Sequence, residues 1–177
     1  SMDHLFLDQD GIPTLVEVKR GTDTRIRREV VGQLLEYAAN AIAYIPPIRI
    51  RAAFEGRCVA EGTTPAEALE AAFGVDVDSD DFWERVEANV LDHRIRLIFV
   101  ADLIPPELTR MVEYLNEQMR TTEVLAVELK QYTGGNLRTL VPRVIGRTAA
   151  AETTKGRAAA TPADSWTWDR FAETLEA

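Results

Sequence analysis

The stretch Asp3–Arg20, DHLFLDQDGIPTLVEVKR, contains two short apolar segments separated by a turn. We predict that residues 4–8 and 14–19 are strands, because aromatic and β-branched side chains concentrate in them. Between them, Gln9-Asp10-Gly11 is typical of a three-residue hairpin loop in which the glycine is left-handed. The length of this loop fixes which residues of the two strands face each other.

The register decides whether two carboxylates meet. A two-residue turn would pair Asp3 with Val18 and place Asp3 and Glu17 on opposite faces of the sheet. A three-residue loop pairs Asp3 with Glu17 and directs Lys19 to the same face, and we favour it because its third position requires glycine. Opposed carboxylates, about 5 Å apart at Cβ, repel each other unless a divalent cation such as Mg²⁺ lies between them.

Lysine beside a metal-bound pair of carboxylates can stabilise the charge that develops on a scissile phosphate. The alternative is a surface strand on which Glu17 and Lys19 form a solvent-facing pair, because this spacing is common. On the next predicted helix, Gln33 and Tyr37 are four residues apart and share a face. They could orient a metal ligand or hold a phosphate, or Tyr37 could be a core aromatic residue with Gln33 beside it.

Together, Asp3, the sequence Glu17-Val18-Lys19 and Gln33-x-x-x-Tyr37 resemble the PD-(D/E)xK nuclease superfamily, most closely its RecB-type branch. The likeness covers roughly residues 3–142 and includes IRLIFVAD, PPELTRMVEYLNEQM and VLAVELKQY. It implies a restriction-endonuclease-like α/β fold, a mixed sheet flanked by helices. It also implies that Asp3, Glu17 and the Val18 carbonyl bind Mg²⁺ or Mn²⁺, that Asp3, Glu17 and Lys19 are catalytic, and that Gln33 and Tyr37 position substrate.

Two departures from the family pattern are visible. Met2 stands where the motif has proline. A helix and a strand usually precede the aspartate-bearing strand in the family, whereas nothing precedes Ser1 here. The resemblance therefore leaves open whether the first core helix and strand are missing.

Charge is distributed unevenly along the chain, whose formal net charge is -9. Residues 19–28 contain five bases and one acid, whereas residues 61–92 contain ten acids and one base. A basic segment on an acidic protein suits a local phosphate contact, although both segments could be solvated helix faces. We therefore add to the candidate substrate-binding residues Arg20, Arg25, Arg27 and Arg28.

The rest of the chain alternates predicted helices and strands. Ile95–Ala101 is a continuous apolar run, typical of a strand buried on both faces. Gly134-Gly135-Asn136 is typical of a hairpin turn. We predict helices at residues 25–44, 64–73, 78–93 and 105–119, an extended piece at 48–54, and further strands at 95–101, 123–132 and 137–144.

We predict three regions: a nuclease-like domain over residues 2–146, a flexible linker over 147–163, and a hook over 164–177. The linker prediction follows from a run of Ala, Thr, Gly and Lys without periodicity. The hook contains Trp166, Trp168 and Phe171, which could dock on this chain, on a partner protein or on a second copy in a homodimer.

Composition excludes several other classes of protein. The single Cys58 cannot form an intrachain disulfide, and with two histidines it cannot supply a usual zinc site. No run of about 18 apolar residues predicts a membrane helix, and the acidic N-terminal residues do not form a signal peptide, so we expect a cytoplasmic protein. The leading expectation is a metal-dependent deoxyribonuclease in defence or repair. The alternatives are a nuclease-fold module that binds DNA without cleaving it, and an assembly domain that recruits a partner.

Overall fold

The computed structural model describes residues 3–20, 26–74, 79–134 and 137–160. Arg25 and the predicted hook therefore lie outside the described residues. The elements in chain order are β1 (His4–Leu7), β2 (Pro13–Lys19), α1 (Ile26–Ala39), α2 (Ala41–Tyr44), α3 (Pro47–Glu61), α4 (Pro65–Phe73), α5 (Ser79–Leu91), β3 (Arg96–Ala101), α6 (Pro106–Gln118), β4 (Glu123–Gly134), β5 (Leu137–Ile145) and α7 (Ala149–Ala160).

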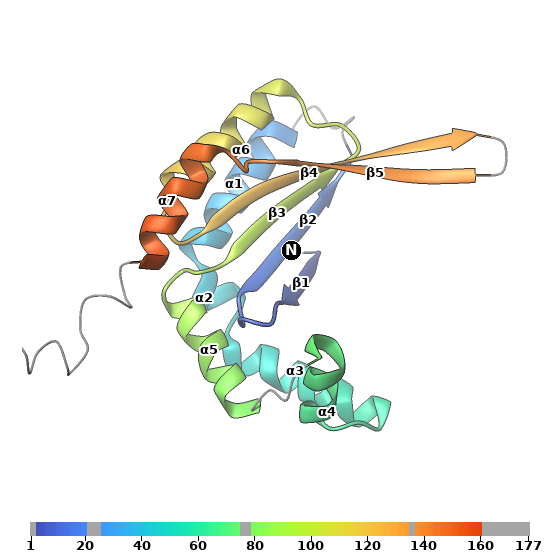
Figure 1. The fold of residues 1–177 in the computed structure, drawn as a ribbon, viewed down its shortest axis with the longest axis vertical. Helices are drawn as coiled ribbons and strands as arrows, with labels where there is room; N and C mark the ends of the chain where they lie inside the picture. Colours follow the sequence, from blue (N-terminus) through green and yellow to red (C-terminus); the bar gives the residue numbers. More distant parts are fainter. Residues whose placement is uncertain (1–2, 21–25, 75–78, 135–136, 161–177) are drawn as a thin grey trace, which may run out of the picture.

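The five strands form one mixed sheet in the order β1-β2-β3-β4-β5 (Figure 1). β1 and β2 are antiparallel, β2, β3 and β4 are parallel to one another, and β4 and β5 are again antiparallel. The predicted α/β class, with a mixed sheet, an antiparallel first pair and a hairpin after Glu123, is confirmed.

The β1–β2 hairpin has the register that the three-residue loop predicts. His4 pairs with Val16 and Leu7 with Pro13. Gly11 has a φ of 72° and donates its N–H to the carbonyl of Asp8 at 3.0 Å. A side chain at Gly11 would also meet α5, because its Cβ would lie 3.1 Å from Val86 Cγ2. Glycine is therefore required both for the backbone conformation and for the close contact with α5.

One face of the sheet is packed by α1, α2 and α6. Both parallel crossovers step in the same direction along the sheet, and right-handed connections then place their covering helices on the same face. Alternate residues of β3 are buried there, whereas the intervening Ile98 and Val100 are only half-buried. The prediction that this strand is buried on both faces is therefore wrong. The main core contains Leu15, Tyr37, Ala41, Ile45, Val90, Ile95, Leu97, Phe99, Ala101, Ile104, Leu108, Val112, Val124, Ala126 and Ile145.

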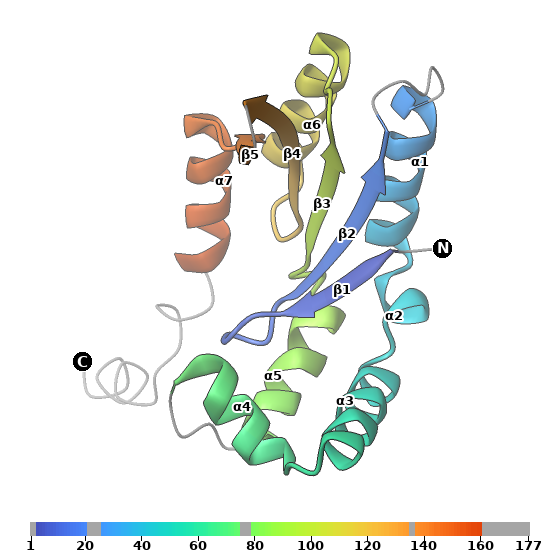
Figure 2. The ribbon, with the colours of Figure 1, turned by 90° about the vertical axis from the view of Figure 1, so that its right-hand side faces the viewer.

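Helices α3, α4 and α5 form a second cluster next to the β1–β2 turn (Figure 2). Residues 48–54 belong to α3 and not to the predicted extended piece. Pro47 is tolerated at the start of a helix, and Ile48 is 79% exposed, so this apolar run does not form a buried strand. The predicted start of α4 is confirmed, because Thr64 and Glu67 form a capping box.

The C-terminal part of the described chain is a helix and not the flexible linker predicted for residues 147–163. Alanine-rich sequence favours helix even without an amphipathic pattern. Ala151 is buried, and its amide donates a hydrogen bond to the hydroxyl of Thr148 at 3.1 Å. Helix α7 packs against α6. Lys155 donates to the carbonyls of Met119 and Thr122. This amine fixes α7 to the loop between α6 and β4, and burial lowers its pKa.

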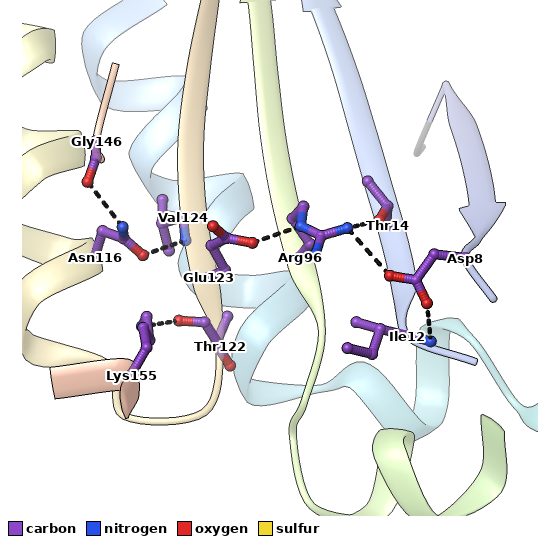
Figure 3. A network of polar contacts seen from close by, with 10 residues as sticks. All are labelled: Asp8, Ile12, Thr14, Arg96, Asn116, Thr122, Glu123, Val124, Gly146 and Lys155. Atoms are coloured by element: carbon purple, nitrogen blue, oxygen red, sulfur yellow. Dashed lines mark hydrogen bonds and ion pairs between the residues drawn. The ribbon is translucent and has the colours of Figure 1, made fainter. Parts of the chain in front are cut away.

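A polar network crosses the amino ends of the parallel strands (Figure 3). The Arg96 guanidinium lies 2.5 Å from Glu123 and 3.5 Å from Asp8, and donates to the Thr14 hydroxyl at 3.1 Å. Burial alone would lower the pKa of Arg96, but the hydrogen bonds and charges of the two carboxylates outweigh it and raise the pKa. The network therefore links β1, β2, β3 and β4 at one end of the sheet.

Candidate active site

The candidate residues lie at the carboxyl end of β2, opposite the end that carries Arg96. Glu17 pairs with Phe99 and Lys19 with Ala101, the last residue of β3. Ligands of α/β proteins commonly bind outside the carboxyl ends of parallel strands. The sheet therefore presents Glu17 and Lys19 where such sites form.

Asp3 lies beside β2 at the open end of the hairpin. The pairing of His4 with Val16 places Asp3 opposite Glu17 when the register is continued by one residue. Oδ2 of Asp3 accepts a hydrogen bond from the Val18 amide at 2.9 Å. The N–H and C=O of one strand residue point to the same side of the strand, so the Val18 carbonyl also points toward β1. Asp3 and the two polar backbone atoms of Val18 thus lie on the same side of β2.

Glu17 is a buried carboxylate in which only one of the two oxygens has a partner among the described residues. Its side chain is 4% exposed, and Oε1 lies 2.6 Å from the Lys19 ammonium. Within the described part of the chain, Oε2 is buried and has no hydrogen-bond partner. Leaving a buried charged acceptor unsatisfied costs more than about 1–3 kcal/mol. The buried Oε2 of Glu17 therefore destabilises the folded state.

Tyr37 and Gln33 are four residues apart on α1 and share a helix face. Tyr37 is buried in the core, and its pKa is raised by burial first and then by the negative charges of Glu17 and Asp3. This electrostatic coupling indicates that Tyr37 is near both carboxylates. One helical turn earlier, Gln33 Oε1 is buried and has no hydrogen-bond partner among the described residues. Tyr37 is thus both a core aromatic residue and a neighbour of the candidate site.

The residues present fit a hard divalent cation. Mg²⁺ binds oxygen, retains several waters and needs only one or two protein carboxylates. Asp3, Glu17 and the Val18 carbonyl supply oxygen donors, and the unpartnered Oε2 of Glu17 is the atom that most needs a cation. In the described ranges no three Asp, Glu, His or Cys side chains cluster as a metal site. The candidate site therefore depends on two carboxylates with backbone and solvent oxygens.

The predicted substrate-binding arginines are described only in part. Arg20 directly follows β2 and is exposed. Arg27 and Arg28 are in the first turn of α1, which begins next to the end of β2, and Arg25 lies outside the described residues (Figure 2). Arg20 and the first turn of α1 therefore lie close to the candidate site.

Sequence reasoning missed Glu128 on β4, a 3% exposed carboxylate next to the site. It pairs with Ala101, which pairs with Lys19, so these three residues share a sheet face. Glu128 accepts the Ile104 amide at 3.1 Å and lies 3.2 Å from Arg143 and 3.4 Å from Lys130. Burial would raise its pKa, but these partners outweigh burial and lower it. The signal was present, because Glu128-Leu129-Lys130 repeats the spacing of Glu17-Val18-Lys19.

No family model, curated protein or solved structure gives a significant match to the chain. Within the described ranges, no helix has both the length and the apolar character needed to cross a bilayer. Function is therefore inferred from the geometry and chemistry of the site.

Proposed function

We propose that this chain is a nuclease of the PD-(D/E)xK type that hydrolyses DNA with Mg²⁺ or Mn²⁺. One observation carries the proposal: Glu17 is a buried carboxylate, opposite Asp3 and beside Lys19, with one oxygen that has no hydrogen-bond partner among the described residues. A buried, half-satisfied anion is unfavourable for stability and is more readily explained by a role in binding a cation than by packing.

Each residue has a proposed role. Asp3, Glu17 and the Val18 carbonyl would hold the cation, which supplies Lewis-acid activation of water and of the scissile phosphate. The Lys19 ammonium would stabilise the charge that develops on the phosphate. Gln33 and Tyr37 would orient Glu17 and exclude water from its buried side. The exposed Arg20, with Arg25, Arg27 and Arg28, would bind the phosphate backbone.

A second candidate function is a nuclease-fold module that binds DNA without cleaving it. The ion pair of Lys19 with Glu17, at 2.6 Å, favours it, because lysine can neutralise this carboxylate without a metal. The two candidates differ in whether Mn²⁺ binds and in whether phosphodiester bonds break.

The test combines plasmid nicking with melting in Mn²⁺. We expect the full chain to nick supercoiled plasmid in millimolar Mg²⁺ or Mn²⁺, and Mn²⁺ alone to raise its melting temperature by mass action. Glu17→Gln should abolish both effects. Lys19→Met should abolish nicking and preserve the Mn²⁺ shift. Asp10→Asn, at an exposed carboxylate in the β1–β2 turn, should change neither.

The outcomes separate the candidates. An unchanged Mn²⁺ shift in Glu17→Gln, or none in the wild type, would overturn the metal site. DNA binding without nicking in either metal would establish the non-cleaving module.

A further inference from the structure

The β4–β5 hairpin extends well beyond the rest of the sheet as an arm (Figure 1). The last pair between β3 and β4 is Ala101 with Glu128. Six further pairs, from Leu129↔Pro142 to Gly134↔Leu137, join β4 only to β5. At about 3.3 Å per residue, the arm is roughly 20 Å long. We define the arm as residues 129–134 and 137–142.

The arm is exposed on both faces. Apart from the half-buried Leu129, every described arm residue is exposed. The exposed apolar side chains include Tyr132 at 57%, Leu137 at 77% and Leu140 at 62%. An isolated two-stranded hairpin is only marginally stable in water. Exposed apolar side chains on such a hairpin therefore point to a partner that covers it.

The charge of the arm identifies the kind of partner. The arm contains two cations, Lys130 and Arg138, and no acid, and Arg143 and Arg147 follow it, in a chain of net charge -9. Lys130 and Arg143 pair with Glu128 at the base of the arm. Lys130 lies on the sheet face of Glu128, whereas Arg138, paired with Thr133, lies on the other face. Cations on both faces, without acids, suit a polyanion that runs alongside the ribbon.

The arm leaves the sheet directly beside the candidate site. Lys19, Ala101 and Glu128 lie side by side on neighbouring strands. A hollow of about 450 Å³ lies at the base of the arm, lined by Asp102, Leu129, Lys130, Gln131, Tyr132 and Leu140. Lys130 therefore lies at the base of the arm beside the candidate site, and Arg138, which pairs with Thr133, lies further out along the arm.

We propose that the arm is a nucleic-acid contact that holds duplex DNA across the Glu17–Lys19 site. This inference rests on the proposed function and adds a surface to it. Lys130 and Arg138 pair with backbone phosphates, and Tyr132 packs against the sugar-phosphate chain. The major groove of DNA, about 12 Å wide, admits a two-stranded ribbon of this kind.

The test measures DNA affinity as a function of salt. The probe is a short fluorescein-labelled duplex, followed by anisotropy in EDTA and again in Ca²⁺, which takes oxygen ligands as Mg²⁺ does. In Lys130→Gln/Arg138→Gln, Arg143 remains as the partner of the buried Glu128. We expect affinity to fall roughly tenfold, and the slope of log K against log salt to shrink by about 2, one unit per lost phosphate contact.

The control variant removes two cations at the other end of the sheet, far from the arm. Arg94 and Arg120 are exposed and precede β3 and β4. Arg94→Gln/Arg120→Gln therefore changes net charge equally, and should leave the slope unchanged. Tyr132→Ala should weaken binding without changing the slope, because it removes contact area and no charge.

The outcomes distinguish failure of the arm from failure of the proposed function. If the wild type binds or nicks DNA and the arm variant matches the control, the arm inference is overturned and the nuclease proposal stands. If the arm variant loses its salt slope but the wild type never nicks DNA, the arm stands and the nuclease proposal fails. If DNA does not bind and Leu137→Ser/Leu140→Ser dissociates a dimer in sedimentation, the arm is an interface between copies of this chain, which also overturns the inference.

Discussion

Arg96, at the amino ends of the parallel strands, and Glu17, near the carboxyl end of β2, differ in how fully their polar atoms are paired. At the amino end, Arg96 joins Glu123, Asp8 and Thr14 (Figure 3). At the carboxyl end, one oxygen of Glu17 pairs with Lys19, and the other is buried and has no hydrogen-bond partner in the described part of the chain.

The paired groups around Arg96 stabilise the folded state, whereas the buried oxygen of Glu17 destabilises it. Most buried polar groups in folded proteins are hydrogen-bonded, and exceptions need an explanation such as a catalytic role or a missing ion. Substitutions at the amino end should therefore destabilise the fold strongly. Substitutions at the carboxyl end should affect metal binding far more than folding.

The largest expected effect is at Asn116, which is 2% exposed. Its amide donates to the Gly146 carbonyl at 2.8 Å, and its oxygen accepts the Val124 amide at 2.8 Å. Asn116→Leu keeps a similar volume but leaves two buried backbone groups unsatisfied, so we expect a loss of about 3 kcal/mol in urea unfolding. Gln118→Leu, the same kind of change at an exposed position of α6, should cost well under half of this. Equal losses in the two variants would show that the two hydrogen bonds of Asn116 contribute little to the free energy of unfolding.

Arg96→Met should have the next largest effect. It keeps an unbranched side chain but removes the cation shared by Glu123 and Asp8, and we expect a loss of about 2 kcal/mol in urea unfolding. An unchanged free energy of unfolding in urea would show that the ion pairs and hydrogen bonds of Arg96 add little to stability.

Glu17→Gln should change the stability of the metal-free protein by less than about 1 kcal/mol. The variant loses an ion pair whose lysine is 28% exposed, but it also removes the uncompensated charge of a buried oxygen. Its melting temperature should no longer respond to Mn²⁺. A metal-free loss as large as that of Arg96→Met would show that Glu17 is structural and would remove the contrast between the two ends.

Local sequence predicted the register of the β1–β2 hairpin better than it predicted the surrounding packing. The register of Asp3 and Glu17 followed from a three-residue loop ending in Gly11, because loop length and backbone conformation are local properties. The helix at residues 149–160 was missed because its sequence has no amphipathic pattern, although its alanine content favours helix. The contact of Lys155 with the α6–β4 loop joins residues remote in sequence. Glu128 was missed although Glu128-Leu129-Lys130 repeats the spacing of Glu17-Val18-Lys19, because its burial and its partners Ile104 and Arg143 come from remote parts of the sequence.

The smallest expected effect concerns pH and tests whether the candidate site is assembled. Burial and the charges of Glu17 and Asp3 raise the pKa of Tyr37. A tyrosine whose pKa is higher in the folded state binds its proton more tightly there, so its contribution to stability is complete below pH of about 10 and is lost as pH rises above that value. In Tyr37→Phe, the free energy of unfolding should therefore decline less steeply than in the wild type above this pH.

Two further variants identify the cause of that decline. Glu17→Gln should lower the pKa of Tyr37 and give a slope between those of the wild type and Tyr37→Phe, because it removes one charge and leaves burial intact. Tyr114→Phe, at a tyrosine 62% exposed, should follow the wild type. If Glu17→Gln also follows the wild type, the phenol of Tyr37 is not coupled to Glu17. The helix motif and the strand motif would then be separate features of the fold, and Tyr37 would be a core residue only.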